Sequence, residues 1–178
     1  MKLSINLLIA VFFILAAVKT SQSQEDYTIS GKVRYSDNNE LVTSGSVKLI
    51  DLTGITVGTA AIGSQGDYIL GPHRLYGDFD LIGFPNIEPE MDFVPTGYPN
   101  QINPQQFTHV FVNSNLTGID IYVLRTPVNP RPNQELLNVN GKVLNNGNVV
   151  KDAIVYAKQG EYYLGFGVSN SLGEFTIN

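Results

Sequence analysis

The chain repeats itself, and this internal repeat is the feature that most limits how it can fold. The phrase around Gly31, YTISGKVRY, returns around Gly141 as LNVNGKVLN. Two further phrases return in the same order and at nearly the same spacing. They are SGSVKLI (44–50) with KDAIVYA (151–157), and SQGDYIL (64–70) with SLGEFTI (171–177). Self-similarity of this kind indicates two copies of one structural unit.

The repeated unit has the sequence pattern of a β-domain. Along residues 27–35 apolar and polar positions alternate, so that Ile29, Val33 and Tyr35 share one face, which predicts a half-buried strand. After residue 24 glycine or proline interrupts every stretch with helical spacing. We therefore expect an all-β fold. The further strands are predicted at 46–50, 55–62, 68–70, 77–84, 107–112 and 118–124.

These seven strands predict a β-sandwich over residues 24–126 as the first module. Three prolines among polar residues suit an extended linker over 127–136. The second module, 137–178, is a truncated copy that stops after four strands, which would leave an apolar face and a sheet edge open. Two explanations stay open: the chain is a fragment of a longer protein, or the module is incomplete by design and accepts strands from a partner.

Alternation in the second module also predicts which of its side chains face inward. Because the strands that would cover this face are missing, we expect the module to be unfolded alone, to self-associate, or to be held against the first module. The inward pairs are expected to be Val139 with Val143, Ile154 with Tyr156, Leu164 with Phe166, and Phe175 with Ile177.

Residues 1–23 are typical of a secretory signal peptide. Lys2 precedes an apolar run from Ile5 to Val18 that is short for a membrane span, and small and polar residues follow it. Cleavage after Ser23 fits this pattern best, and an uncleaved anchor helix is the alternative. We expect a secreted protein, extracellular or at the cell surface, with no stable membrane insertion after cleavage.

Composition excludes several classes of function. The formal net charge is −5, and loss of Lys2 and Lys19 with the signal peptide makes it more negative. Such a surface gives no electrostatic reason to bind nucleic acid. The chain has no cysteine, which excludes disulfides, a thiolate metal site and a cysteine nucleophile. No cofactor is expected.

The Gly-Lys-Val strand at 31–33 and the Gly-aromatic strand at 66–70 resemble carboxypeptidase regulatory-like modules, which are transthyretin-like (prealbumin-like) seven-stranded sandwiches. DFVPTGYPNQI and NLTGIDIYVLR further resemble repeat modules of large secreted bacterial proteins, which often end in a type IX secretion sorting domain. The resemblance covers most of 27–125 and, less completely, 137–177. It implies a spacer or binding role on a carbohydrate-binding-like fold and carries over no catalytic residue. No sorting domain is found in this sequence, which fits a missing C-terminus.

One acidic loop could hold a metal. NIEPEMDF places Glu88, Glu90 and Asp92 at alternate positions, so an extended backbone would point all three carboxylates the same way. Carboxylate oxygens are ligands that Ca²⁺ prefers. The loop lacks the glycine and the full ligand count of an EF-hand, and an acidic solvated loop is the alternative reading.

The two histidines, His73 and His109, do not stand at a metal-ligand spacing. A Ser-His-Asp triad stays open because its members come from distant positions, although the sequence has no Gly-x-Ser-x-Gly elbow. His109 falls within a predicted apolar strand, where a hydrogen-bonded structural histidine is commoner.

Aromatic residues provide candidates for stacking on a sugar ring. Tyr98 lies in the long loop of the first module, and Tyr162 and Tyr163 are adjacent in the second. Neighbouring residues of a strand point to opposite faces, so one of these two must face outward. Exposed rings bind sugars in sandwich lectins. Packing in the β-core is the competing interpretation.

Together these features predict a non-enzymatic extracellular module that acts as a spacer, presents other domains, or binds a glycan or another surface protein. The alternative is a set of accessory modules from a secreted hydrolase, a peptidase or glycosidase, whose catalytic domain lies outside this chain.

Export gives the first test. N-terminal sequencing of the exported protein should find Gln24, or a residue within a few positions of it, at the start of the mature chain. Exported protein that still carries Met1 to Val18 would contradict the signal peptide.

Overall fold

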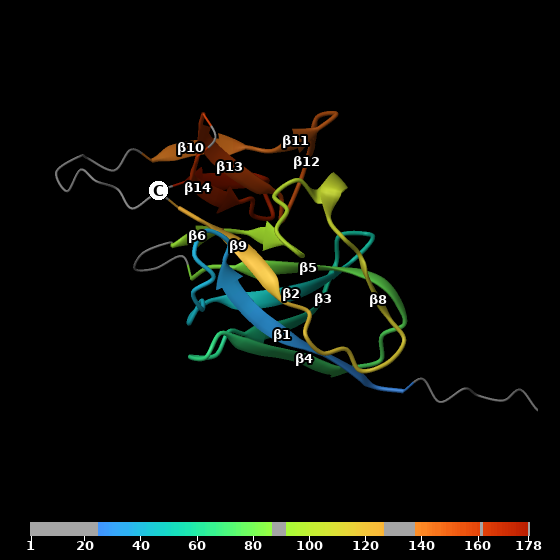
Figure 1. The fold of residues 1–178 in the computed structure, drawn as a ribbon. Coiled ribbons are helices and arrows are strands. Elements are labelled where there is room, and N and C mark those ends of the chain that lie inside the picture. The colour runs from blue at the N-terminus through green and yellow to red at the C-terminus, as the bar shows by residue number, and fades with distance from the viewer. Residues whose placement is uncertain (1–24, 87–91, 127–137, 161, 178) are drawn as a thin grey trace, which may run out of the picture.

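A computed structural model describes residues 25–86, 92–126, 138–160 and 162–177. It confirms the all-β fold: two unequal β-units follow one another, and the only helical element in the described ranges is a short 3-10 turn, Pro104–Gln106. Figure 1 shows the first unit in blue to yellow and the second in orange to red. Within these ranges no helix is long and apolar enough to cross a membrane. The predicted signal peptide and linker lie outside them.

Two sheets face each other in the first unit. In the first sheet, of order β4-β1-β9-β6, β1 pairs antiparallel with β4 and parallel with β9. Its strands are β1 (Tyr27–Tyr35), β4 (Asp67–His73), β6 (Phe93–Val94) and β9 (Ile121–Arg125). In the second, β3-β2-β5-β7, β8 also pairs with β5. Its strands are β2 (Ser46–Asp51), β3 (Thr56–Ala61), β5 (Gly77–Phe84), β7 (Thr96–Gly97) and β8 (Val110–Val112).

The hydrophobic core of the first unit lies between these sheets. Along β1 the predicted inward residues Ile29, Val33 and Tyr35 are all buried, as alternation requires. Both sheets and the segments that join them contribute to this core. Its other fully buried members include Val42, Val47, Leu49, Tyr68, Leu70, Leu81, Phe93, Val112, Ile121 and Val123.

Because Gly31 has no side chain, the segment that leads into β9 can lie close to the second edge of β1. A Cβ atom at this position would lie 2.1 Å from the carbonyl oxygen of Ile119, in the segment that leads into β9. That distance is far below van der Waals contact, and the neighbouring atoms are backbone that cannot rotate away. The missing side chain therefore permits the close approach of the two segments.

The second unit consists of two-stranded pairs. Strand β10 (Val139–Lys142) pairs antiparallel with β15 (Glu174–Ile177), and β13 (Ile154–Gln159) with β14 (Tyr162–Val168). A hairpin joins β11 (Leu144–Asn145) to β12 (Asn148–Val149). Its turn places Asn146 at φ 49° and Gly147 at φ 82°, as the Asn-Gly signal predicts.

The first and second units share a pairing register. Gly31 is opposite Tyr68 between β1 and β4, and Gly141 is opposite Phe175 between β10 and β15. Two residues after each glycine, the strand makes the same backbone hydrogen bond, which measures 2.8 Å in both units. It runs from Val33 N to Gly66 O and from Val143 N to Gly173 O.

The turn before the aromatic strand matches as well. In the first unit Gly63 N donates to Asp67 O at 2.8 Å and Gly66 N donates to Gly63 O at 2.9 Å. In the second unit the same bonds join Asn170 N to Glu174 O at 2.8 Å and Gly173 N to Asn170 O at 2.9 Å. The sequence repeat thus coincides with matching backbone geometry.

The second unit rests on the first through β14, which contacts β6. The phenol of Tyr156 donates a hydrogen bond of 2.9 Å to Pro95 O, just after β6. Burial, and then the neighbouring Tyr163, raise the pKa of Tyr156. Phe166 and Ile177 are also buried. Of the three expected outcomes for this unit, the structure corresponds to packing against the first.

Two of its predicted inward residues face solvent instead. Val139 is 51% exposed, although its counterpart Ile29 is only 1% exposed. Leu164 is 48% exposed because the pairing slips: Ala157 is opposite Gly165 but Lys158 is opposite Tyr163. Leu164 is therefore the extra residue of a β-bulge, which breaks the alternation.

A charge at the centre of the core should unfold the first unit. Val33→Asp buries a carboxylate at a side chain that is 0% exposed, and we expect a loss of several kcal/mol in unfolding free energy. Thr59→Asp, on the exposed side of β3, is the matched control and should change stability by less than about 0.5 kcal/mol. Chemical denaturation of both variants would test this, and equal midpoints would contradict the proposed core.

Candidate functional site

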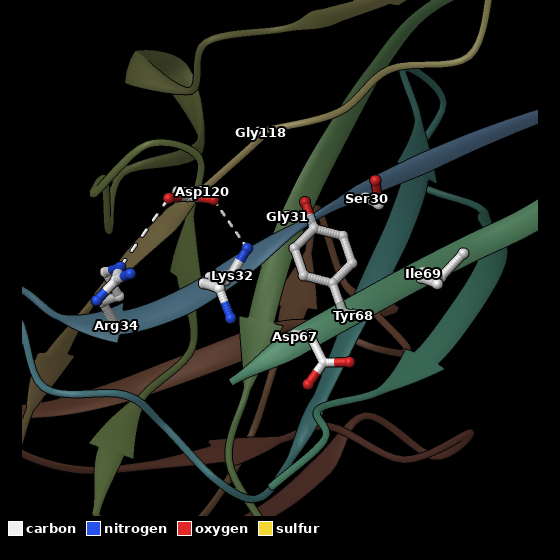
Figure 2. A pocket seen from close by; sticks show the side chains of 9 residues that line it. All are labelled: Ser30, Gly31, Lys32, Arg34, Asp67, Tyr68, Ile69, Gly118 and Asp120. Atoms are coloured by element: carbon white, nitrogen blue, oxygen red, sulfur yellow. Dashed lines mark hydrogen bonds and ion pairs between the residues drawn. The ribbon is translucent and has the colours of Figure 1, made fainter. Parts of the chain in front are cut away.

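A depression of about 490 Å³ opens on the outer face of β1, beside β4 (Figure 2). Since Ile29 and Val33 point into the core, the side chains of Ser30, Lys32 and Arg34, which alternate with them along β1, point outward. The depression is lined by Ser30, Gly31, Lys32 and Arg34 of β1, by Asp67, Tyr68 and Ile69 of β4, and by Gly118 and Asp120.

Asp120 connects the far side of the depression to β1. Gly118 turns the chain at φ 73°, and two residues later the Oδ1 atom of Asp120 accepts a hydrogen bond of 2.8 Å from Lys32 N. Its other oxygen lies 4.0 Å from Nε of Arg34. The carboxylate thus occupies a position where a strand backbone would otherwise provide the acceptor.

Both cations of the depression are bonded to the protein. Nζ of Lys32 donates to Gln65 O at 2.9 Å, and a guanidinium nitrogen of Arg34 donates to Asn39 O at 3.1 Å. Lys32 is also opposite Asp67 in the β1–β4 ladder. Two cations and two carboxylates balance one another, so the surface offers hydrogen bonds of both polarities with little net charge.

Tyr68 lies beneath the depression. Its ring is buried in the core and its hydroxyl donates a hydrogen bond of 2.6 Å to Ile119 O. Burial raises the pKa of Tyr68, and the negative charge of Asp120 raises it further. The phenol is therefore held neutral and ties β4 to the segment before β9.

A second cluster forms where β1, β6 and β9 end. The hydroxyl of Tyr35 donates to the carboxylate of Asp92, and the guanidinium of Arg125 lies 3.5 Å from the centre of the Tyr35 ring. Burial and then this hydrogen bond raise the pKa of Tyr35. Arg125 also pairs with Asp37 at 3.2 Å and Glu40 at 3.3 Å. The cluster thus connects the ends of β1 and β9 with the residue that precedes β6.

The calcium candidates can be placed only in part. Glu88 and Glu90 lie outside the described residues, whereas Asp92 is committed to the Tyr35 hydroxyl. No group of three histidine, aspartate or glutamate side chains in the described ranges could hold a metal ion.

The two histidines have separate surroundings. His73 covers Gly58 of β3, where a Cβ atom would lie 2.7 Å from Nε2 of the imidazole. His109 immediately precedes β8, and its Nδ1 atom is 2.6 Å from the Oδ1 atom of Asp80. This pair orients the ring, but catalysis would require a nucleophile on its other nitrogen, and the described contacts of His109 include no hydroxyl.

The candidate aromatic platforms differ in exposure. Tyr98 is partly buried and packs against the core of the first unit. Tyr162 is 69% exposed, and Tyr163 is partly buried with its ring 5.6 Å from that of Tyr156. One of the adjacent pair thus faces outward, and Tyr162 is the ring available for stacking.

Sequence reasoning did not single out the depression. Alternation along β1 places the side chains of Lys32 and Arg34 on the outer face, so the sequence pattern alone predicts their position. Asp120 belongs to a segment 88 residues further along the chain than Lys32, and no spacing rule joins the two. As a chemical arrangement the depression presents donors and acceptors that are paired with one another and carry little net charge.

Comparisons with known proteins add little. No family model matches the chain, and no curated protein matches it by sequence. Among solved structures, "The Bacillus anthracis TIE protein" is similar at 9% identity and a TM-score of 0.36 over 85% of this chain. The chain spans 26% of that protein's length. A likeness this weak carries no argument about function.

The buried phenols predict a loss of stability at high pH. In the unfolded chain Tyr68 titrates near 10.0, while in the folded protein its pKa is raised. The stability that depends on the neutral phenol is complete below pH 10 and declines as the pH rises above it, because only the unfolded state loses the proton. Urea denaturation between pH 8 and 11 should show this decline, and Tyr68→Phe should make it shallower. Parallel curves for the two proteins would contradict the assignment.

Proposed function

We propose that this chain is a non-enzymatic extracellular protein that acts as a spacer and presents neighbouring domains, with two copies of a transthyretin-like module in tandem. The observation that carries the proposal is the shared backbone geometry of the two units, in which the bonds around Gly66 recur around Gly173. Tandem copies of one module are the usual construction of an extended spacer.

A spacer must also fix the orientation of its modules. The hydrogen bond from Tyr156 to Pro95 O and the contact of β14 with β6 supply such a connection. The phenol is largely removed from water, so its hydrogen bond to Pro95 O contributes to holding the two units together. This contact favours a single orientation of the two units.

The depression on β1 is consistent with binding rather than with catalysis. Lys32, Arg34 and Asp120 each have a partner within the protein, whereas a catalytic acid or base must be able to exchange its proton with a substrate. A neutral glycan or a polar surface of another protein suits these paired groups. The module would then act as a binding domain as well as a spacer.

The orientation can be measured directly because the native chain has no cysteine. Thr59→Cys on β3 and Asn148→Cys on β12 would each carry one spin label, and both positions are exposed. Pulsed electron resonance should give a single narrow distance distribution. Tyr156→Phe should broaden it, since the hydrogen bond to Pro95 is lost.

Tyr162→Phe is the matched control and should leave the distribution narrow, because Tyr162 is exposed. A broad distribution in the unmodified pair would contradict a fixed spacer. Hydrolysis of peptide or glycoside substrates by the purified chain, at a rate that rises with protein concentration and survives repurification, would overturn the non-enzymatic assignment.

A further inference from the structure

We propose that the free edge of β10 binds an extended strand of another polypeptide, parallel to β10, with a carboxylate near Lys142. The occupant resembles the segment Leu116–Val123 of this chain in its alternating apolar residues and in its aspartate. The proposal follows from comparing β10 with β1, and it does not depend on whether the chain acts as a spacer.

In the first unit the corresponding edge of β1 is filled. Ser30 N donates to Leu116 O at 2.9 Å, and Ile119 N donates to Ser30 O at 3.1 Å. Further along, Lys32 N donates to the carboxylate of Asp120 at 2.8 Å. Strand β9 then continues in parallel, with Val33 opposite Ile121. On this edge of β1, the N–H and C=O groups of Ser30 and the N–H group of Lys32 therefore all have hydrogen-bond partners.

In the second unit the same edge has no strand on it. Since Gly141 corresponds to Gly31 in register, Asn140 corresponds to Ser30 and Lys142 to Lys32. Their backbone groups point away from β15, and β10 pairs with no other strand in the described part of the chain. Both residues are exposed. Figure 1 shows β10 and β11 on the side of the second unit that faces away from the first, where a strand could approach.

Exposed apolar side chains indicate that something should cover this region. Ile29 and Val33 are buried in the core between the two sheets, but Val139 is 51% exposed and Val143 is only partly buried. Unpaired edges with exposed apolar residues are the surfaces that other strands bind. Val139 and Val143 flank Asn140 and Lys142, whose backbone groups lie on this unpaired edge of β10.

Gly141 and Gly31 have different neighbours, and this difference provides a way to detect binding of a strand. In the first unit the space of the absent Cβ atom of Gly31 lies against Ile119 O. In the second the ring of Phe175 fills the equivalent space, 2.6 Å from where a Cβ atom of Gly141 would be. Tyr68, the counterpart of Phe175, is turned so that its hydroxyl meets Ile119 O. An incoming strand should therefore displace the Phe175 ring from Gly141.

The experiment adds a synthetic peptide with the sequence of Ser114–Thr126 to the purified, isotope-labelled chain. The amides of Asn140 and Lys142 should exchange with solvent at least tenfold more slowly on binding. The Phe175 ring resonances should shift with the same affinity. The amides of Ser30 and Lys32 serve as an internal control and should not change, which excludes replacement of the chain's own β9.

Two changes test the mode of binding. A peptide with Asp120→Ala should bind at least fivefold more weakly, since Lys142 N loses its acceptor. A peptide N-methylated at Ile119 keeps its side chains but cannot donate to Asn140 O, and it should give no protection. This second reagent leaves the protein unaltered, so a folding defect cannot explain its result.

A protein variant provides the matching evidence. Asn140→Pro removes the outward N–H, which an edge position tolerates, and should abolish peptide binding. Protection of the Phe175 amide would show that β10 and β15 still pair in the variant.

Several outcomes would overturn the proposal. They are no protection at a peptide concentration of about 1 mM, equal binding of the N-methylated peptide, or protection of Asn140 that grows with protein concentration without peptide. The last result would assign the edge to a second copy of this chain.

Discussion

The fold rests on β1 being hydrogen-bonded along both edges. On one side it pairs with β4, and on the other with β9 and the segment before it. This second contact is possible only because Gly31 has no side chain to meet Ile119 O. With both edges satisfied, β1 can bury Val33 without leaving backbone groups unpaired in the interior. The core of the first unit is assembled around this central strand.

The same constraint explains why the second unit differs. Strand β10 repeats the register of β1, but among the described residues it is paired on one edge only, and its apolar residues are more exposed. The contact of β14 with β6 and the hydrogen bond of Tyr156, in β13, to Pro95 O instead hold the second unit against the first. The second unit is therefore stabilised by its neighbour rather than by a closed sandwich of its own.

The depression on β1 is a consequence of the crossing that fills the second edge. Where the segment before β9 approaches β1, the carboxylate of Asp120 takes the place of a backbone acceptor for Lys32 N. Its charge then lies beside Lys32 and Arg34 instead of in solvent. In this part of the molecule the depression and the strand pairing share one side chain, so changes to Asp120 should affect both.

The sequence by itself determined the all-β class, the inward face of β1, the Asn-Gly hairpin and the order of the repeated phrases. The first three depend on neighbours within a few residues, where periodicity and turn chemistry act directly, and the repeat can be read by comparing the phrases themselves. It predicted Leu164 on the wrong face because a bulge is set by the partner strand. Only the tertiary structure placed Asp92 on the hydroxyl of Tyr35 and Asp120 beside Lys32. The residues of these pairs are 57 and 88 positions apart in the sequence. Their contact depends on how whole sheets pack, and a local sequence pattern contains no information on that packing.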